Sequence, residues 1–212
     1  AYGVTGVQRD RVTNSWTNNG KLASITDGNG NKTTYGYDGF DRLITTQYPS
    51  PTSMGTSSTT DYEQLGYDSN GNVTTRRLRD GTSIAFTYDN LNRITLKDLP
   101  GSDPDVSYNY DNLGRLLSTS QSDDMRSFSY DALGRMRTQV GPLGTVTAEY
   151  DLAGKRTKLS YPGSFYINYD YDAAGEMTTV RENGATAGAA VLATYSYDDR
   201  GRRLGLTLGN GA

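Results

Sequence analysis

Apolar and polar side chains alternate over short stretches along most of the chain. Aromatic residues stand two positions apart, as in the pairs Tyr35 and Tyr37 or Tyr108 and Tyr110, and Val106 precedes the second pair by two more positions. A period of two places such side chains on one face of a strand. The pattern predicts half-buried β-strands of roughly 5–8 residues, separated by turns.

One phrase returns between these strands. It consists of an aromatic residue, an Asp, two free positions, a Gly, a basic residue and an aliphatic residue, and it is clearest in residues 110–116 and 130–136. Such regular recurrence predicts tandem copies of one small structural unit. The aromatic residue of the phrase falls at Trp16, Tyr37, Tyr67, Tyr88, Tyr110, Tyr130, Tyr150, Tyr171 and Tyr197.

The Asp and the Gly of the phrase predict a tight turn. Only the first copy, with Thr17, lacks the Asp, and the Gly position is otherwise occupied only by Asp41 and Asn92. Gly, Asn and Asp tolerate a positive φ best, and an Asp three residues before such a position is typical of a type I turn that closes a hairpin through a bulge. Each phrase is therefore expected to form the turn of a hairpin. We call this turn the head.

We expect the following residues to form this repeated structural motif: Tyr37, Asp38, Tyr67, Asp68, Gly71, Tyr88, Asp89, Tyr110, Asp111, Gly114, Arg115, Tyr130, Asp131, Gly134, Arg135, Tyr150, Asp151, Gly154, Tyr171, Asp172, Gly175, Tyr197, Asp198 and Gly201.

A second set of turn formers lies about half a period after each Gly. It predicts a second turn per repeat, here called the tail turn, at residues 27–30, 80–81, 100–102, 141–144, 162–164 and 183–184. Two periods are stretched, by a Pro/Ser/Thr/Gly segment at residues 47–60 and an Ala/Gly segment at residues 185–190. Both segments are expected to be longer loops on one edge of the array.

Composition favours one thin sheet over a packed globule. The hydrophobic fraction is 34%, the mean hydropathy is −0.68, and 17 Tyr stand against 4 Phe and 1 Trp. Tyr buries area while its hydroxyl stays hydrogen-bonded, which suits a sheet with at least one wet face. We expect a single array over residues 1–212, cut from a longer protein because both ends fall inside the repeat pattern; residues 1–4 do not resemble a signal peptide.

The Tyr-Asp-x-x-Gly-Arg-Leu phrase, often preceded by a second Tyr as in residues 35–38, 108–111, 169–172 and 195–198, resembles the YD repeats of the Rhs family. The resemblance covers residues 16–204. Members include Rhs polymorphic toxins, B and C subunits of insecticidal toxin complexes, wall-associated proteins and teneurins. The resemblance implies an all-β strip of tandem antiparallel hairpins that spirals into a hollow shell, often around a toxin, in a secreted or cell-surface protein.

Sheet physics also favours a curled or spiralling strip. Nine hairpins would supply about eighteen strands, on the order of 85 Å of sheet, and open twisted sheets beyond ~10 strands tend to curl or split. A self-cleaving DPxG-type core segment, which complete Rhs shells carry, is not found: residues 103–105 read Asp-Pro-Asp without the following Gly. Neither that cleavage nor a toxin activity is therefore expected of this chain.

The residue types leave little room for catalysis. Without His or Cys, the chain cannot build a Ser-His-Asp triad, a Cys nucleophile or a His-ligated metal site. No catalytic, cofactor-binding or metal-binding residue is expected, and the repeated Asp residues are interpreted as turn caps rather than acid-base groups. Residues 27–31 and 68–72 resemble calcium loops but lack the Glu that completes an EF-hand loop, so they are interpreted as ordinary turns.

Two repeated columns leave alternatives open. The basic residues after the heads could pair with neighbouring acids in a ladder or bind a ligand, and the Tyr columns could pack or form a platform on which sugars stack. The net charge of −3 without a basic run argues against nucleic acid, and no stretch of ~18–20 apolar residues could span a membrane.

The function expected from the sequence is a non-catalytic structural scaffold. It would be one segment of a shell that encloses or carries a polypeptide toxin, with the remaining repeats as its partners. The alternative is a cell-surface adhesion or carbohydrate-binding module with glycans as partners. Unpaired edge strands could also pair with a second copy of the chain.

Overall fold

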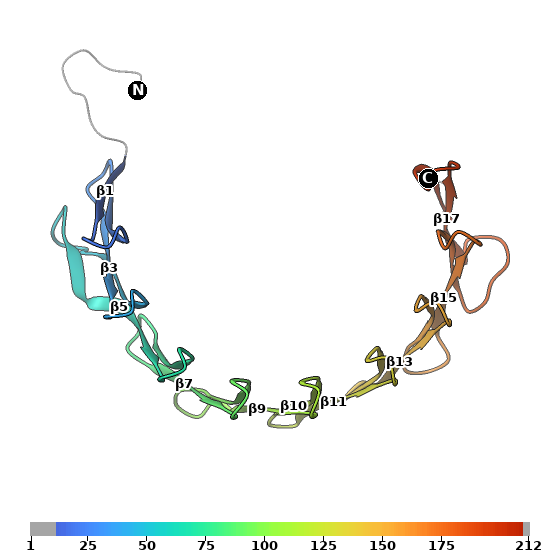
Figure 1. Ribbon diagram of the computed structural model, residues 1–212, viewed down its shortest axis with the longest axis horizontal. Helices are drawn as coiled ribbons and strands as arrows, with labels where there is room; N and C mark the ends of the chain where they lie inside the picture. Colours follow the sequence, from blue (N-terminus) through green and yellow to red (C-terminus); the bar gives the residue numbers. More distant parts are fainter. Residues whose placement is uncertain (1–11, 210–212) are drawn as a thin grey trace, which may run out of the picture. The chain divides into compact units, whose positions relative to one another are not determined.

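The computed structural model describes residues 12–209, so the chain start at residues 1–4 lies outside the described part. Contacts divide the chain into two compact units, Ala1–Ser107 and Tyr108–Ala212, which are described separately. Residues 12–209 form 18 strands and no helix (Figure 1). The predicted all-β class is therefore confirmed. The predicted extent of a single array over residues 1–212 stays a prediction.

The first unit contains eight complete strands and the start of a ninth: β1 (Val12–Trp16), β2 (Leu22–Asp27), β3 (Lys32–Tyr37), β4 (Leu43–Pro49), β5 (Ser57–Tyr67), β6 (Val73–Arg77), β7 (Ser83–Tyr88), β8 (Ile94–Asp98) and β9 (Val106–Tyr110). The second unit contains the end of β9 and the strands β10 (Leu116–Gln121), β11 (Asp124–Tyr130), β12 (Met136–Gly141), β13 (Gly144–Tyr150), β14 (Arg156–Ser160), β15 (Tyr166–Tyr171), β16 (Met177–Glu182), β17 (Val191–Tyr197) and β18 (Arg203–Leu208).

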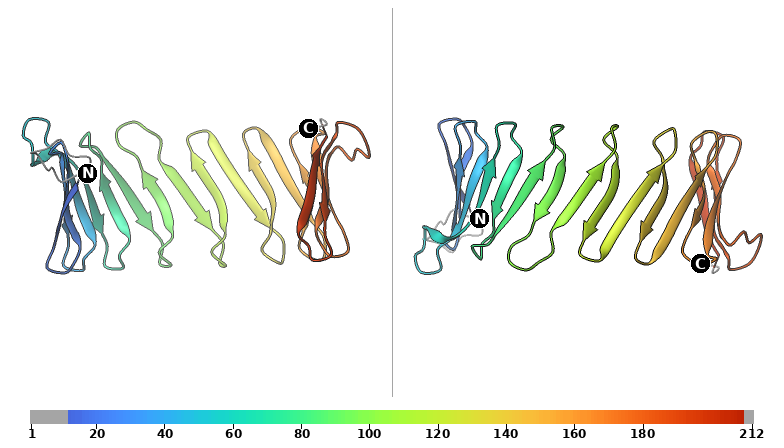
Figure 2. Two further views of the ribbon diagram at one scale, coloured as in Figure 1. Left: turned by 90° about the horizontal axis from the view of Figure 1, so that it is seen from above. Right: turned by 90° about the horizontal axis from the view of Figure 1, so that it is seen from below.

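Strands that follow each other along the chain lie side by side within each unit. Every strand pairs antiparallel with the next, from β1 to β9 in the first unit and from β10 to β18 in the second. In each unit the strands form a single layer, with turns along both edges (Figure 2). The predicted tandem hairpins are confirmed.

All nine heads have the predicted turn geometry. In the head after Tyr130, the Asp131 amide donates to the Arg135 carbonyl at 2.9 Å and the Gly134 amide donates to the Asp131 carbonyl at 3.0 Å, with Gly134 at φ 80°. The strand register shifts at Tyr130, which pairs with Met136 across the bulge. This combination is a type I turn followed by a bulge with a left-handed residue. The residues at positive φ are Gly20, Asp41, Gly71, Asn92, Gly114, Gly134, Gly154, Gly175 and Gly201.

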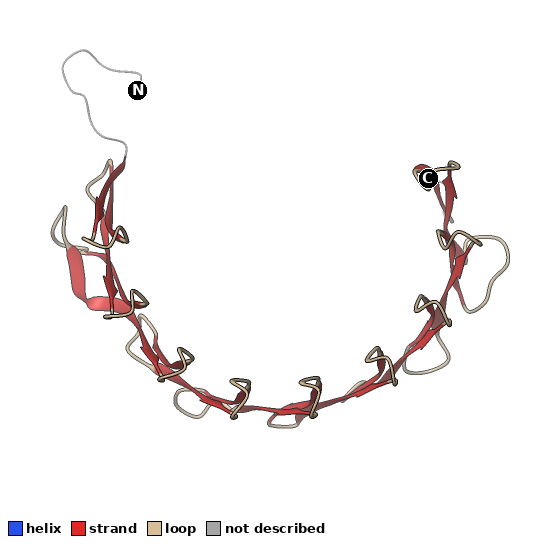
Figure 3. Cartoon of the chain, viewed as in Figure 1, coloured by secondary structure: helices blue, strands red, loops and turns tan. Residues whose placement is uncertain are grey.

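The tail turns follow the prediction less closely (Figure 3). The turns at residues 27–30 and 80–81 repeat the head geometry, with positive φ at Gly30 and Gly81. One tail turn was not predicted: Gln121 pairs with Asp124, and Ser122 between them has φ 49°. The sequence there has Ser and Asp but lacks the Gly that marks the predicted tail turns.

The prediction of one long loop over residues 47–60 is wrong. Strand β4 continues to Pro49, strand β5 begins at Ser57, and these two residues pair with each other. The Ser57 hydroxyl donates to the Lys32 carbonyl at 2.9 Å, and Ser58 is buried. The Ser57 hydroxyl thus ties the start of β5 to β3, and β5 is longer than the predicted 5–8 residues. The loop at residues 185–190 is confirmed between β16 and β17.

The strip has almost no enclosed core. Among residues 12–209, the buried apolar side chains are Ala148, Ile167 and Ala193, with exposed fractions of 8%, 9% and 7%. Most large side chains are half-buried, as a single sheet wet on its faces requires. Stability must therefore come from ladder hydrogen bonds and from contacts between neighbouring strands. The described part of the chain offers no helix that could cross a bilayer.

Candidate functional site: the ladder of hairpin heads

The Asp of each head accepts hydrogen bonds from its own turn. In the head of Asp131, Oδ1 accepts from the amides of Leu133 and Arg135, both at 2.9 Å, and Oδ2 accepts from Arg135 Nε at 2.6 Å. Desolvation raises the pKa of the Asp131 carboxyl, but the Arg135 amide and guanidinium together with the Leu133 amide outweigh it and lower this pKa below its ordinary value. The same three contacts occur in the heads of Asp38, Asp89, Asp111 and, with Arg200 and Arg202, Asp198.

The hydroxyl of the motif tyrosine reaches back to the preceding hairpin. Tyr130 Oη donates to the carbonyl of Leu116, which is the aliphatic residue after the preceding head. Equivalent bonds of 2.8–3.0 Å run from Tyr37 to Leu22, Tyr67 to Leu43, Tyr88 to Val73, Tyr150 to Met136, Tyr171 to Arg156 and Tyr197 to Met177. The acceptor is a backbone carbonyl, so the bond persists where Arg156 replaces the aliphatic residue. We call this bond the latch.

The basic residue of a head lies over the motif tyrosine of the next head. The Arg135 guanidinium carbon is 4.6 Å from the Tyr150 ring centroid, and Arg135 Nη1 donates to the Asp151 carbonyl at 3.2 Å. The pairs Arg42 with Tyr67, Arg115 with Tyr130 and Lys155 with Tyr171 repeat the stacking at 4.4–5.2 Å. The guanidinium of Arg42, Arg115 or Arg135 therefore contacts both its own Asp and the next repeat. The predicted pairing ladder is confirmed for these three heads.

The two heads without Gly carry an additional bridge. Asn19 Nδ2 donates to Asp41 Oδ1 at 2.9 Å, and Asn70 Nδ2 donates to Asn92 Oδ1 at 3.0 Å. Tolerance of a positive φ is therefore only part of the reason for Asp41 and Asn92 at the position that is Gly in the other heads. Each of them also accepts a hydrogen bond from an Asn of the preceding head.

Sequence comparison identifies the family. The model of the RHS Repeat family matches residues 16–53, 67–103, 110–146 and 130–165, which together exceed half of the chain. The chain belongs to the RHS repeat family. No sequence match was found among curated proteins.

Several solved structures share the fold of this Rhs-repeat chain. The crystal structure of TcdB2-TccC3-TEV aligns with a TM-score of 0.68 and 13% identity over 94% of this chain, and that of TcdB2-TccC3-Cdc42 aligns with a TM-score of 0.61 and 14% identity over 94%. TcdB2-TccC3 aligns with a TM-score of 0.58 and 16% identity over 91%. The chain spans 11–13% of the length of those chains. At such identities the likeness concerns the fold.

The carboxylates of the Rhs repeats are occupied by the turns themselves. In the two segments that resemble calcium loops, Asp27 accepts from the amides of Asn29 and Asn31, and Asp68 accepts from those of Asn70 and Asn72. These bonds are those of ordinary Asx turns. Within residues 12–209, no group of three or more His, Cys, Asp or Glu is arranged to hold a metal ion.

Shallow clefts open on the described part of the Rhs strip. In the first unit, a cleft of about 440 Å³ is lined by apolar side chains that include Leu65, Val73 and Phe86, together with the ion pair of Arg76 and Glu63. In the second unit, clefts of about 460 Å³ and 590 Å³ lie between successive heads, beside Lys155 and Glu176 respectively. The sequence patterns did not indicate these clefts, because side chains from successive repeats form them.

Proposed function

We propose that this Rhs-repeat chain is a non-catalytic segment of a shell wall, and that the wall of the full protein encloses a polypeptide such as a toxin. The observation that carries the proposal is the ladder, in which each repeat uses its Tyr, Asp and basic residue to bind its own turn and the neighbouring repeat. Conserving the same contacts from head to head supports a chain whose main task is to extend a uniform sheet.

The thinness of the sheet supports the role of a wall. A single layer with almost no enclosed core leaves both faces available, one for contents and one for solvent. The fold shared with the TcdB2-TccC3 structures supports the same role. The chain covers only 11–13% of the length of those chains, so enclosure would require further repeats.

The state of the head carboxylates supports a non-catalytic role. A general acid needs a carboxyl that holds its proton near neutral pH. Burial raises the pKa of Asp111, but the amide and guanidinium of Arg115 and the amide of Leu113 lower it below its ordinary value. Such a carboxylate stays ionised and serves as an acceptor for its turn.

The ladder favours packing over sugar binding for the motif tyrosines. A sugar platform needs a free ring face, whereas Tyr67, Tyr130 and Tyr150 each have a guanidinium over the ring and donate the hydroxyl to a latch. We further propose that the full protein is secreted or displayed at the cell surface, as the family resemblance implies. Pairing of open edges with a second copy stays a prediction.

Limited proteolysis of the full-length gene product tests enclosure. The product is treated with a protease, and fragments are followed by mass spectrometry over time. We expect any segment outside the Rhs repeats to resist cleavage until the strip unfolds, because a wall would exclude the protease. The control is the same segment produced without the repeats. Equal cleavage rates for the two forms would contradict the proposal.

A further inference from the structure

One head carries the opposite charge at the basic position of the ladder, where the head after Tyr67 has the neutral Asn72. In the head after Tyr171, the position that holds Arg115 or Arg135 in earlier heads is occupied by Glu176. The Glu176 backbone keeps the turn, since its amide donates to Asp172 Oδ1 at 2.8 Å. The difference therefore concerns only the side chain that reaches toward the next head. Its effect can be read by comparing this junction with those of Arg115 and Arg135.

The carboxylate of Glu176 takes the place of a guanidinium. A Cβ built on Gly134 would lie 3.7 Å from Arg115 Nη1, and one built on Gly201 would lie 2.7 Å from Glu176 Oε1, so both side chains end beside the Gly of the next head. The following tyrosine, Tyr197, keeps its latch to Met177. Within residues 12–209, however, no cation stacks on the Tyr197 ring, in contrast to Tyr130 and Tyr150.

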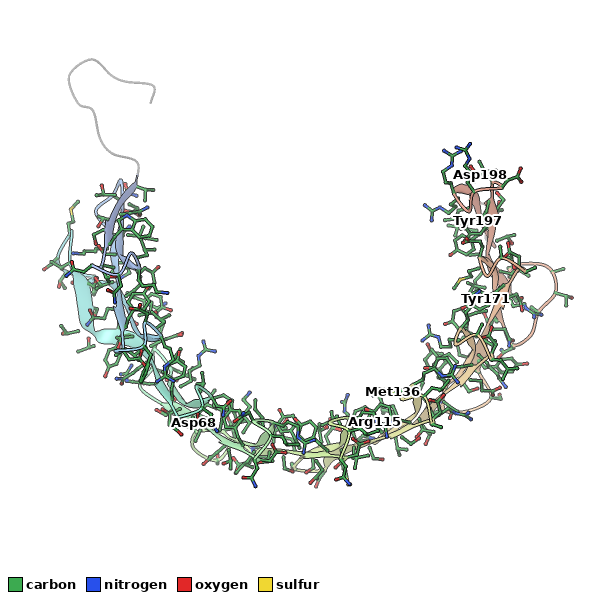
Figure 4. All side chains as sticks on the ribbon, viewed as in Figure 1. Asp68, Arg115, Met136, Tyr171, Tyr197 and Asp198 are labelled. Atoms are coloured by element: carbon green, nitrogen blue, oxygen red, sulfur yellow. The ribbon has the colours of Figure 1, made fainter. Side chains whose placement is uncertain are left out.

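An acidic cleft of about 590 Å³ opens at this junction, between the heads that follow Tyr171 and Tyr197. Figure 4 labels these two tyrosines and Asp198. Its lining includes Asp172, Glu176, Asp198, Asp199 and the rings of Tyr195 and Tyr197. At the junctions of Arg42, Arg115 and Arg135, the same combination of a head Asp and the next motif tyrosine holds a guanidinium from this chain. The repeats thus show which group the combination binds when the chain supplies it.

We propose that this cleft binds the guanidinium of an arginine side chain from a partner polypeptide, beside the Glu176 carboxylate that stands where Arg135 has its own guanidinium. Planar guanidinium can donate to carboxylates and stack on a tyrosine ring at the same time. This binding goes beyond a role in a shell wall and does not depend on enclosure.

Neighbouring arginines do not balance the negative charge of the cleft. Arg202 is paired with Asp198 through Nε at 2.7 Å. Arg200 also lines the cleft, and its side chain is exposed. No ion pair of Arg200 is found in the described part of the chain. The four carboxylates therefore exceed the local positive charge.

Binding of Nα-acetylarginine amide to the whole chain tests this inference. Chemical shifts of ¹³C-labelled tyrosine rings are followed by NMR, with Nα-acetylcitrulline amide as the neutral control of the same shape. We expect saturable shifts at Tyr197 with the arginine compound and none with citrulline. Absence of saturable shifts, or equal shifts with both compounds, would overturn the proposal.

Two substitutions at one position sharpen the test. E176R should fill the cleft from within, and E176Q should remove one charge while keeping the fold; each should weaken binding of the arginine compound by roughly tenfold or more, because a charge-assisted contact is lost. The reverse change, R135E, should create a second responding ring at Tyr150. Unchanged affinity in both E176R and E176Q would refute the assignment, whether or not R135E folds.

Discussion

The hydroxyl of Tyr130 donates a hydrogen bond of 2.9 Å to the carbonyl of Leu116, and this bond joins β11 to the start of the preceding hairpin's outgoing strand. The two residues are far enough apart in sequence that no local turn rule relates them. Within residues 12–209, six further motif tyrosines donate the same bond: Tyr37, Tyr67, Tyr88, Tyr150, Tyr171 and Tyr197. They are contacts between repeats in a strip without a core, so their loss should be measurable.

The substitution Tyr130→Phe removes one latch while keeping the ring. We expect a loss of about 0.5–1.5 kcal/mol in the free energy of unfolding, the usual contribution of one hydrogen bond. Urea denaturation followed by circular dichroism measures it. Tyr161→Phe is the matched control, because no hydrogen bond of the Tyr161 hydroxyl is found within residues 12–209. Equal effects of the two substitutions would contradict the role of the latch.

The substitution Gly134→Val forces a β-branched residue into the left-handed position of a head, where φ is 80°. The strain should cost on the order of 1–2 kcal/mol. Thermal unfolding measures the effect, and Gly39→Val provides the comparison, since Gly39 belongs to a head but has no positive φ. A Gly134→Val protein as stable as its parent would refute the turn assignment.

The bridge from Asn70 to Asn92 predicts coupling between two neighbouring heads. Asn70→Ala should destabilise the chain when Asn92 is present and have little effect when Asn92→Gly has already removed the acceptor. For an exposed pair we expect a coupling free energy of about 0.5 kcal/mol. A double-mutant cycle by urea denaturation measures it, and strictly additive effects would show that the bridge contributes nothing.

Stability should fall in acid because the head carboxylates have lowered pKa values. In the heads of Asp89 and Asp198, hydrogen bonds from Arg93 and Arg202 are the largest causes of the lowering. A carboxyl with a lower pKa in the folded chain binds fewer protons than in the unfolded chain, so its contribution is complete above the unfolded pKa and disappears as pH falls through the folded pKa.

We therefore expect the Tm to be nearly constant from pH 7 to about pH 5 and to decline steadily below that. Asp131→Asn should lower the Tm at pH 7 and reduce the decline, since one titrating group has been removed. Calorimetry at constant ionic strength measures both. A Tm that rises on acidification below pH 5 would contradict the predicted direction.

The turn geometry of the heads could be predicted from the sequence, whereas the contacts between repeats could not. Asp131 and Gly134 are three residues apart and determine one turn, so their spacing alone indicated its geometry. The latch from Tyr130 to Leu116 and the stacking of Arg135 on Tyr150 depend on strand register, which sequence spacing does not specify. The turn at Ser122 was missed because backbone pairing on both sides imposes a positive φ on a residue that does not favour it.

The misjudged segment at residues 47–60 has a related cause. Its Ser and Thr content is typical of a loop, but the hydroxyl of Ser57 has partners on β3, at the Lys32 carbonyl and at Thr34 Oγ1. Partners that lie on another hairpin cannot be inferred from the composition of the segment itself. The sequence shows that residue 176 is Glu where most other heads have a basic residue. The effect of this difference could be inferred only once the positions of the neighbouring tyrosine rings were known.

The latch has a direction along the chain. In every case the tyrosine is synthesised after the carbonyl that it binds, as with Met177 and then Tyr197. During translation, the acceptor carbonyl of one hairpin therefore has no latch partner until the next hairpin has been synthesised and packs against it. The strip can grow in order from its amino-terminal side, each repeat serving as the template for its successor.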